Sequence, residues 1–145
     1  MNSTSSSLTV GHRADLAKSG LSAEQIAACG FDSIHIPRDI ARLLKWSKAD
    51  GLGSCLLIPY RRSDGSIVSV DEFARLKPDC PRTDTKSKKP IKYESPKGST
   101  TRLYFPPNSC RLLADISVPL LITEGEKKAA KADQEGFACV GLGTA

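Results

Sequence analysis

The chain has 145 residues, of which 39% are hydrophobic and 26% are charged, and its formal net charge is +5. This length is enough for one hydrophobic core or two small ones, and the composition is typical of a globular cytoplasmic protein. No apolar run approaches the roughly 20 residues that a membrane-spanning helix needs, and the serine-rich start lacks the basic and apolar regions of a signal peptide. We therefore predict a cytoplasmic location and no membrane partner.

Five cysteines are spread along the chain, at positions 29, 55, 80, 110 and 139. Each lies more than twenty residues from the next, and no Cys-x-x-Cys pair is present. A zinc knuckle needs closely spaced ligands, and a disulfide framework needs an even number of thiols. We interpret the five as buried or incidental thiols.

The N-terminal region predicts a lead followed by two helices. Residues 1–11 are expected to form a flexible lead, with structure beginning near His12. The stretch from Ser22 to Gln25 has the pattern of a capping box, which predicts a short helix after it. A second helix is expected to begin at Pro37, because proline suits a first turn and apolar residues then recur at helical spacing. Both helices are interpreted as scaffold.

A β-hairpin is predicted next, with strands over residues 55–60 and 67–77 and a tight turn between them. Side chains alternate across a strand, so Phe73, Arg75 and Lys77 would share one face. An aromatic ring between two cations suits single-stranded nucleic acid, because the ring stacks on bases and the cations meet phosphates. A bulge near Glu72 would exchange the two faces. An ordinary half-exposed strand is the alternative interpretation.

Positive charge is concentrated between Arg75 and Arg102, where nine basic residues face three acidic ones, a local surplus of +6. Such a surplus attracts polyanions and is typical of nucleic-acid-binding proteins, although a solvated lysine-rich loop is the alternative. Two short strands are expected around this loop, at 91–93 and 101–105. The residues there that are suited to phosphate or base contact are Lys92, Tyr93 and Arg102.

The C-terminal region begins with an apolar strand that stops on a carboxylate. Residues 120–125 read Leu-Leu-Ile-Thr-Glu-Gly, a helix is expected over 126–135, and a second strand follows at 137–140. This order is that of one βαβ unit. A buried strand of this kind delivers Glu124 to the crevice beyond the strand ends, where open α/β sheets hold ligands. Gly125 permits the sharp turn.

These motifs resemble three related groups of proteins. The Glu124-Gly125 unit resembles the first motif of the Toprim fold, the Mg²⁺-dependent catalytic domain of bacterial primases, type IA and II topoisomerases and certain nucleases. Upstream segments are similar to the core of bacterial replicative primases, namely residues 19–26 with 30–31, 58–60 with 64–67, and 92–93 with 95–96. The domain that precedes Toprim in plasmid, phage and mobile-element primase-helicases is a closer match, at residues 58–60, 75–79, 92–99 and 123–129.

The resemblance implies roles for particular residues. Glu124 would act as general base for a 3′-hydroxyl or as a ligand of Mg²⁺. Lys127 and Lys128 would meet phosphate at a helix N-terminus. The alternative for Glu124 and Lys128 is a small helix-surface contact. Arg75, Lys77 and Lys92 would hold template or incoming nucleotide. The implied partners are single-stranded DNA or RNA, nucleoside triphosphates and a helicase domain or subunit.

The chain also departs from the Toprim pattern. That fold carries an Asp-x-Asp pair on a later strand, and no Asp-x-Asp occurs in this sequence. One carboxylate seldom holds Mg²⁺, which takes several oxygen ligands. We therefore expect residues 12–117 to be a primase-like N-terminal subdomain and residues 118–145 to be the start of a truncated Toprim domain. We expect the chain to be catalytically inactive alone and to be part of a longer protein or a truncated gene product.

The predicted fold class is α/β, a small mixed α+β subdomain followed by the first βαβ unit of an incomplete parallel sheet. Because later strands are missing, residues 118–140 should expose a sheet edge and favour self-association. Three functions remain open. They are the N-terminal portion of a primase-like nucleotidyltransferase, a stand-alone single-strand-binding module, and a fragment of a Toprim nuclease or topoisomerase.

Overall fold

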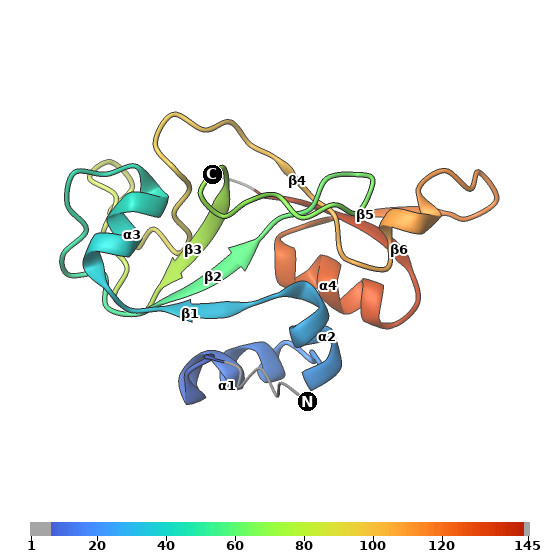
Figure 1. Ribbon diagram of the computed structural model, residues 1–145, viewed down its shortest axis with the longest axis horizontal. Coiled ribbons are helices and arrows are strands. Elements are labelled where there is room, and N and C mark those ends of the chain that lie inside the picture. The colour runs from blue at the N-terminus through green and yellow to red at the C-terminus, as the bar shows by residue number, and fades with distance from the viewer. Residues whose placement is uncertain (1–6, 144–145) are drawn as a thin grey trace.

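Two three-stranded sheets form the centre of the computed structural model, which describes residues 7–143 (Figure 1). The first has the order β1-β2-β3 and the second the order β4-β6-β5. In chain order the elements are α1 (Val10–Lys18), α2 (Ala23–Cys29), β1 (Asp32–Ile34), α3 (Pro37–Leu44), β2 (Cys55–Pro59), β3 (Ala74–Pro78), β4 (Leu103–Tyr104), the 3-10 helix η1 (Cys110–Leu112), β5 (Leu120–Glu124), α4 (Glu126–Gln134) and β6 (Ala138–Leu142). The predicted mixed α/β class is confirmed.

The first sheet is antiparallel and contains the predicted hairpin, but its second strand is shorter than expected. Strand β3 starts at Ala74, whereas residues 67–73 form one isolated bridge and then a turn. The amides of Glu72 and Phe73 both donate to the carbonyl of Ser69, which closes that turn. Side chains therefore do not alternate regularly between two faces from residue 67 to residue 77. The prediction that this whole segment is one strand with two faces is wrong.

The second sheet confirms the predicted βαβ unit. Strands β5 and β6 pair in parallel from Leu120 opposite Ala138 to Glu124 opposite Leu142, and α4 connects them. Strand β4 pairs antiparallel with β6, which makes β6 central and leaves β5 at an edge. The expectation of a buried strand is wrong for β5, because Ile122 is 65% exposed. The predicted open edge is present in the described part of the chain.

The N-terminal helices pack beneath the two sheets (Figure 1). Helix α1 starts at Val10 with Thr9 as its N-cap, so structure begins earlier than predicted, and residues 1–6 of the predicted lead lie outside the described residues. Ser22 caps α2 as predicted, since its hydroxyl accepts from the amide of Gln25. The Gln25 side chain does not reach back to Ser22. It donates to the Ala130 carbonyl and the Asp133 carboxylate of α4 instead. The backbone amide of Ser22 donates to the side chain of Gln134, which also belongs to α4.

Two hydrophobic clusters hold these layers together. The larger includes Leu16, Ile58, Tyr60 and Tyr104 and therefore joins α1 and both sheets, while the smaller lies under α3 around Leu44. Cysteines 29, 55 and 139 are buried, and all five thiols are free, as interpreted from their spacing. Among the helices of the described residues, none has the length and apolar character that a bilayer crossing needs.

Candidate functional site

Glu124 occupies the C-terminal end of β5, where the parallel register pairs it with Leu142. Gly125 follows with a φ of 88° and donates its amide to the Leu142 carbonyl at 2.9 Å, which turns the chain into α4. The Glu124 side chain is exposed and lines a cavity of about 500 Å³. The carboxylate therefore lies at the sheet rim that the sequence predicted.

The opposite wall of this cavity comes from the basic loop, which we define as residues 82–93. The lining residues other than Glu124 are Arg75, Asp84, Ser87, Lys89, Pro90, Ile91, Lys92 and Tyr93. Three residues singled out in the sequence, Arg75, Lys92 and Tyr93, thus meet Glu124 around one space. Arg75 lies on β3 and the other two on the basic loop, all more than thirty positions before Glu124 in the chain, so only the tertiary fold brings them together.

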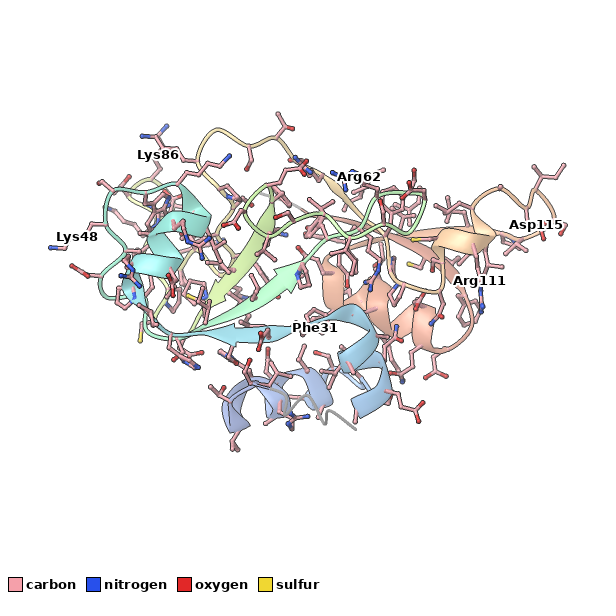
Figure 2. The ribbon with its side chains drawn as sticks, in the orientation of Figure 1. Phe31, Lys48, Arg62, Lys86, Arg111 and Asp115 are labelled. Atoms are coloured by element: carbon pink, nitrogen blue, oxygen red, sulfur yellow. The ribbon has the colours of Figure 1, made fainter. Side chains whose placement is uncertain are left out.

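The basic loop has a defined conformation. The Asp84 carboxylate accepts from the amides of Lys86 and Ser87, and the amide of Asp84 donates to the Lys89 carbonyl. A bridge between Thr83 and Pro90 closes the base of the loop. This folding back presents the lysines outward, and Figure 2 shows Lys86 at the end of the molecule opposite Asp115.

Five lysines of this region, which we call the loop lysines, are exposed and have no ion-pair partner within residues 7–143. They are Lys86, Lys88, Lys89, Lys92 and Lys97. Unpaired surface ammonium groups keep their full positive field, which attracts phosphate and releases counterions when it binds. The positive surplus predicted from the sequence is therefore available mainly on this loop.

The other four cations of the stretch, the paired cations, are neutralised by carboxylates. Their pairs are Arg75 with Glu126 at 2.7 Å, Lys77 with Asp15 at 2.9 Å, Arg82 with Glu94 at 2.7 Å, and Arg102 with Glu72 at 3.6 Å. Burial raises the pKa of Asp15, but hydrogen bonds from Lys77 and Lys127 outweigh that effect and leave the pKa below its ordinary value. These cations serve the fold first.

Phe73 does not form the predicted stacking platform. Its side chain is only 2% exposed, and its ring packs edge-on against Tyr60 with centroids 4.9 Å apart. The guanidinium of Arg102 lies 4.6 Å from the Phe73 centroid. Because the turn before β3 points the ring into the core, no base can stack on it, and the predicted face of Phe73, Arg75 and Lys77 is corrected.

Lys127 and Lys128 lie away from the Glu124 cavity. Both line a second groove of about 620 Å³ with Leu121 and Phe137 on the outer side of α4. Lys127 bonds to Asp15 at 3.1 Å, while Lys128 is exposed and has no ion pair among the described residues. A phosphate contact by Lys127 or Lys128 stays a prediction, and neither residue lines the Glu124 cavity.

Glu126 is the important residue that sequence reasoning missed. It is the first residue of α4, and its side chain is 2% exposed. One oxygen, Oε1, accepts from Tyr60 Oη and from Arg75 Nη1, both at 2.7 Å. Burial and the neighbouring Glu126 charge raise the pKa of Tyr60, so its hydroxyl stays protonated and donates. No local signal exists for these contacts, because the partners are 66 and 51 positions away.

The residues present do not make a magnesium centre. Among residues 7–143 there is no group of three or more His, Cys, Asp or Glu side chains that could hold a metal ion. The cavity lining supplies two carboxylates, Glu124 and Asp84, and Asp84 is already hydrogen-bonded within the loop. A hard ion such as Mg²⁺ needs more oxygen ligands than this. The cavity therefore brings lysine side chains and the Glu124 carboxylate around one space.

The comparisons with known proteins find similarity in structure and not in sequence. No protein-family model matches the chain, and no curated protein matches it in sequence. The Aquifex aeolicus primase, solved with its zinc-binding and RNA polymerase domains, aligns with a TM-score of 0.66 at 12% identity over 94% of this chain. The DnaG catalytic core aligns with a TM-score of 0.54 at 19% identity over 91%, and the DnaG primase catalytic domain bound to ssDNA with 0.56 at 20% over 99%.

The chain spans 38%, 46% and 51% of these three structures, respectively. The alignments nevertheless cover nearly all of this chain. The described fold is therefore similar to part of the catalytic core of bacterial primases.

Proposed function

We propose that the chain is the N-terminal part of a primase-like Toprim nucleotidyltransferase and that it binds a single nucleic-acid strand and nucleotide phosphates at the Glu124 cavity. The observation that carries the proposal is the shared cavity, in which a carboxylate at the end of β5 faces Lys89, Lys92 and Tyr93. The similarity of the fold to primase cores supports it. The motifs shared with mobile-element primase-helicases suggest replication of a plasmid, phage or mobile element.

Under this proposal the two walls of the cavity have different tasks. Ammonium groups of Lys89 and Lys92 would meet phosphate oxygens, which positions a strand without reading its sequence. Glu124, exposed at the rim, can accept a proton from a hydroxyl placed there. Mg²⁺ chemistry belongs to the family, but the described carboxylates do not provide its ligands. We therefore assign binding to this chain and no complete reaction.

A salt series with a labelled oligonucleotide tests the proposal. Fluorescence anisotropy should show binding to a single strand that weakens steeply with salt, and Lys89→Ala with Lys92→Ala should reduce the slope by about 1.4, since each phosphate contact contributes about 0.7. Lys18→Ala is the matched control, because it removes an exposed lysine of α1 outside the cavity. Absent binding, or binding that salt does not affect, would contradict the proposal.

A second candidate, a stand-alone single-strand-binding module, is favoured by the same lack of a metal cluster in the described residues. It predicts oligonucleotide binding and no primer synthesis with Mg²⁺ and nucleoside triphosphates under any condition. Primer synthesis that appears when a separate polypeptide with an Asp-x-Asp strand is added would decide for the nucleotidyltransferase. A nuclease or topoisomerase fragment has no supporting observation, because the structural neighbours are primase cores.

A further inference from the structure

Three buried polar residues meet where the two sheets join, and we call them the junction. Tyr60 follows β2 directly, Arg75 belongs to β3, and Glu126 begins α4. Tyr60 is 1% exposed, and the side chains of Arg75 and Glu126 are 6% and 2% exposed. The junction thus connects the first sheet with the βαβ unit through groups that water barely reaches.

The contacts within the junction are directional. Glu126 Oε1 receives hydrogen bonds of 2.7 Å from both Tyr60 Oη and Arg75 Nη1. The backbone of Gly143, just beyond β6, closes over them, since a Cβ placed there would lie 3.0 Å from Arg75 Nη1 and 3.0 Å from Tyr60 Oη. The second sheet can approach this closely because residue 143 has no side chain.

The junction reaches both walls of the Glu124 cavity. On one side, the guanidinium carbon of Arg75 lies 4.9 Å from the centroid of the Tyr93 ring, which lines the cavity. On the other side, Glu126 follows Glu124 after a single glycine at the start of α4. A change in the Arg75–Glu126 geometry would therefore move the basic wall relative to the acidic one.

Stability alone does not account for such an arrangement. Removing two charges from water is costly, and well-packed hydrophobic residues in place of a buried ion pair are often as stable or more so. Hydrogen bonds to charged groups, in contrast, fix distance and angle, which apolar contacts do not. A buried, hydrogen-bonded pair between two sheets is suited to setting their relative position.

We propose that the junction is a positioning device for the cavity, in which Glu126 and Arg75 hold Tyr93 and Glu124 at a set separation across a bound phosphate-bearing strand. Both are positioning residues: Glu126 acts through its neighbours, and Arg75, which also lines the cavity, contacts the Tyr93 ring. This inference rests on the proposed function, since the strand is the ligand whose placement the junction controls.

The test replaces the junction with apolar groups of similar size. The variant carries Tyr60→Phe, Arg75→Met and Glu126→Met, which removes both charges together with the hydroxyl that bonds to Glu126, so neither charge is left behind without the other. Its melting midpoint should stay within about 4 °C of the wild type, which corresponds to about 1 kcal/mol at this size. Its affinity for a labelled single-stranded oligonucleotide should fall by about tenfold, whereas unchanged affinity would overturn the proposal.

A matched control removes an ion pair that has no link to the cavity. Lys131 and Glu135 form an exposed pair on α4 at 2.6 Å, and Lys131→Met with Glu135→Met should leave affinity within about twofold. A tenfold loss in this control as well would show that any lost pair weakens binding, and the proposal would fail.

Fluorine NMR separates this inference from the proposed function. With 3-fluorotyrosine in place of the three tyrosines, and Tyr93→Phe for assignment, the Tyr93 signal should be single in the wild type. It should shift or split in the triple variant, whether or not the protein binds nucleic acid. An unchanged Tyr93 signal overturns the inference, while absent oligonucleotide binding with a shifted signal overturns only the proposed function.

A second variant keeps the test decisive if the triple variant does not fold. Glu126→Gln preserves the size of the side chain and an acceptor for Tyr60 but removes the charge that holds Arg75. We expect a moved Tyr93 signal and an affinity lowered by about threefold. Wild-type values for both measurements would overturn the proposal.

Discussion

Two sets of cations occupy the stretch from Arg75 to Arg102, and the fold uses them in opposite ways. The paired cations, three of them arginines, contact carboxylates of other elements. The loop lysines project into solvent without such partners in the described part of the chain. A planar guanidinium can donate two parallel hydrogen bonds to one carboxylate, whereas an ammonium group is strongly hydrated and tends to stay in water. Side-chain chemistry thus divides one basic stretch into a structural part and a solvent-facing part.

This division changes how the positive surplus of the sequence should be interpreted. Counting residues gives nine basic against three acidic positions, but the acids that neutralise Arg75, Lys77 and Arg102 lie outside the stretch. The field that a polyanion meets therefore comes from fewer groups than the count suggests. A paired cation that controlled affinity directly, or a loop lysine that controlled stability, would contradict this division.

The largest expected effect comes from breaking the buried pair at one partner only. Glu126→Ala leaves the Arg75 guanidinium charged and without its carboxylate at a site that is 6% exposed. We expect a loss of about 3–5 kcal/mol in the free energy of unfolding, measured by urea denaturation. Glu24→Ala, at an exposed site of α2, is the control and should change stability by about 0.5 kcal/mol or less. A similar small effect for Glu126→Ala would contradict the structural role of the paired set.

A smaller effect is expected from adding one methyl group over the same pair. In Gly143→Ala the new Cβ would lie 3.0 Å from Arg75 Nη1 and Tyr60 Oη, so the junction must shift. Overpacking of this kind costs about 1–3 kcal/mol, which thermal unfolding would detect. Gly11→Ala meets nothing within 4 Å and serves as the control. Equal stability of the two variants would show that the close approach at residue 143 is not constrained.

A crossed experiment compares one member of each set. Arg82→Ala removes the two hydrogen bonds to Glu94, which is 4% exposed, and should lower stability while leaving oligonucleotide affinity nearly unchanged. Lys89→Ala should do the reverse, with affinity about threefold weaker at low salt and stability within about 0.5 kcal/mol of the wild type. Fluorescence anisotropy gives the oligonucleotide affinity of each variant, and urea denaturation gives its free energy of unfolding. The division fails if both variants change the same quantity.

The smallest effect is a pH dependence at Asp15. The pKa of this carboxyl is lowered in the folded chain, so its contribution to stability is present above the unfolded value and disappears as pH falls through the folded value. Asp15→Asn should therefore be less stable than the wild type near pH 7, by about 1 kcal/mol or less, and equally stable at strongly acidic pH. Unfolding curves across that range give the difference. A gap that persists in acid would assign the effect to packing.

Much of the local structure was determined by the sequence. The βαβ unit could be predicted because an apolar run, a glycine and a helix-forming stretch are local signals, and Ser22 and Pro37 mark helix starts for equally local reasons. Glu124 could be assigned to a strand end on the same basis. The fold class and the similarity to primase cores follow from this order of elements.

Only the tertiary structure decided which side chains are available for a ligand. The turn closed at Ser69 directs the Phe73 ring into the core. Arg75 is buried because it pairs with Glu126, which lies 51 positions further along the chain. The alternation of side chains along a strand therefore could not predict whether either residue is exposed. The exposure of β5 likewise depends on which strands lie beside it. Burial and ion pairing depend on which residues are neighbours in space. Those neighbours are determined by how the two sheets pack together, which no local segment of sequence specifies.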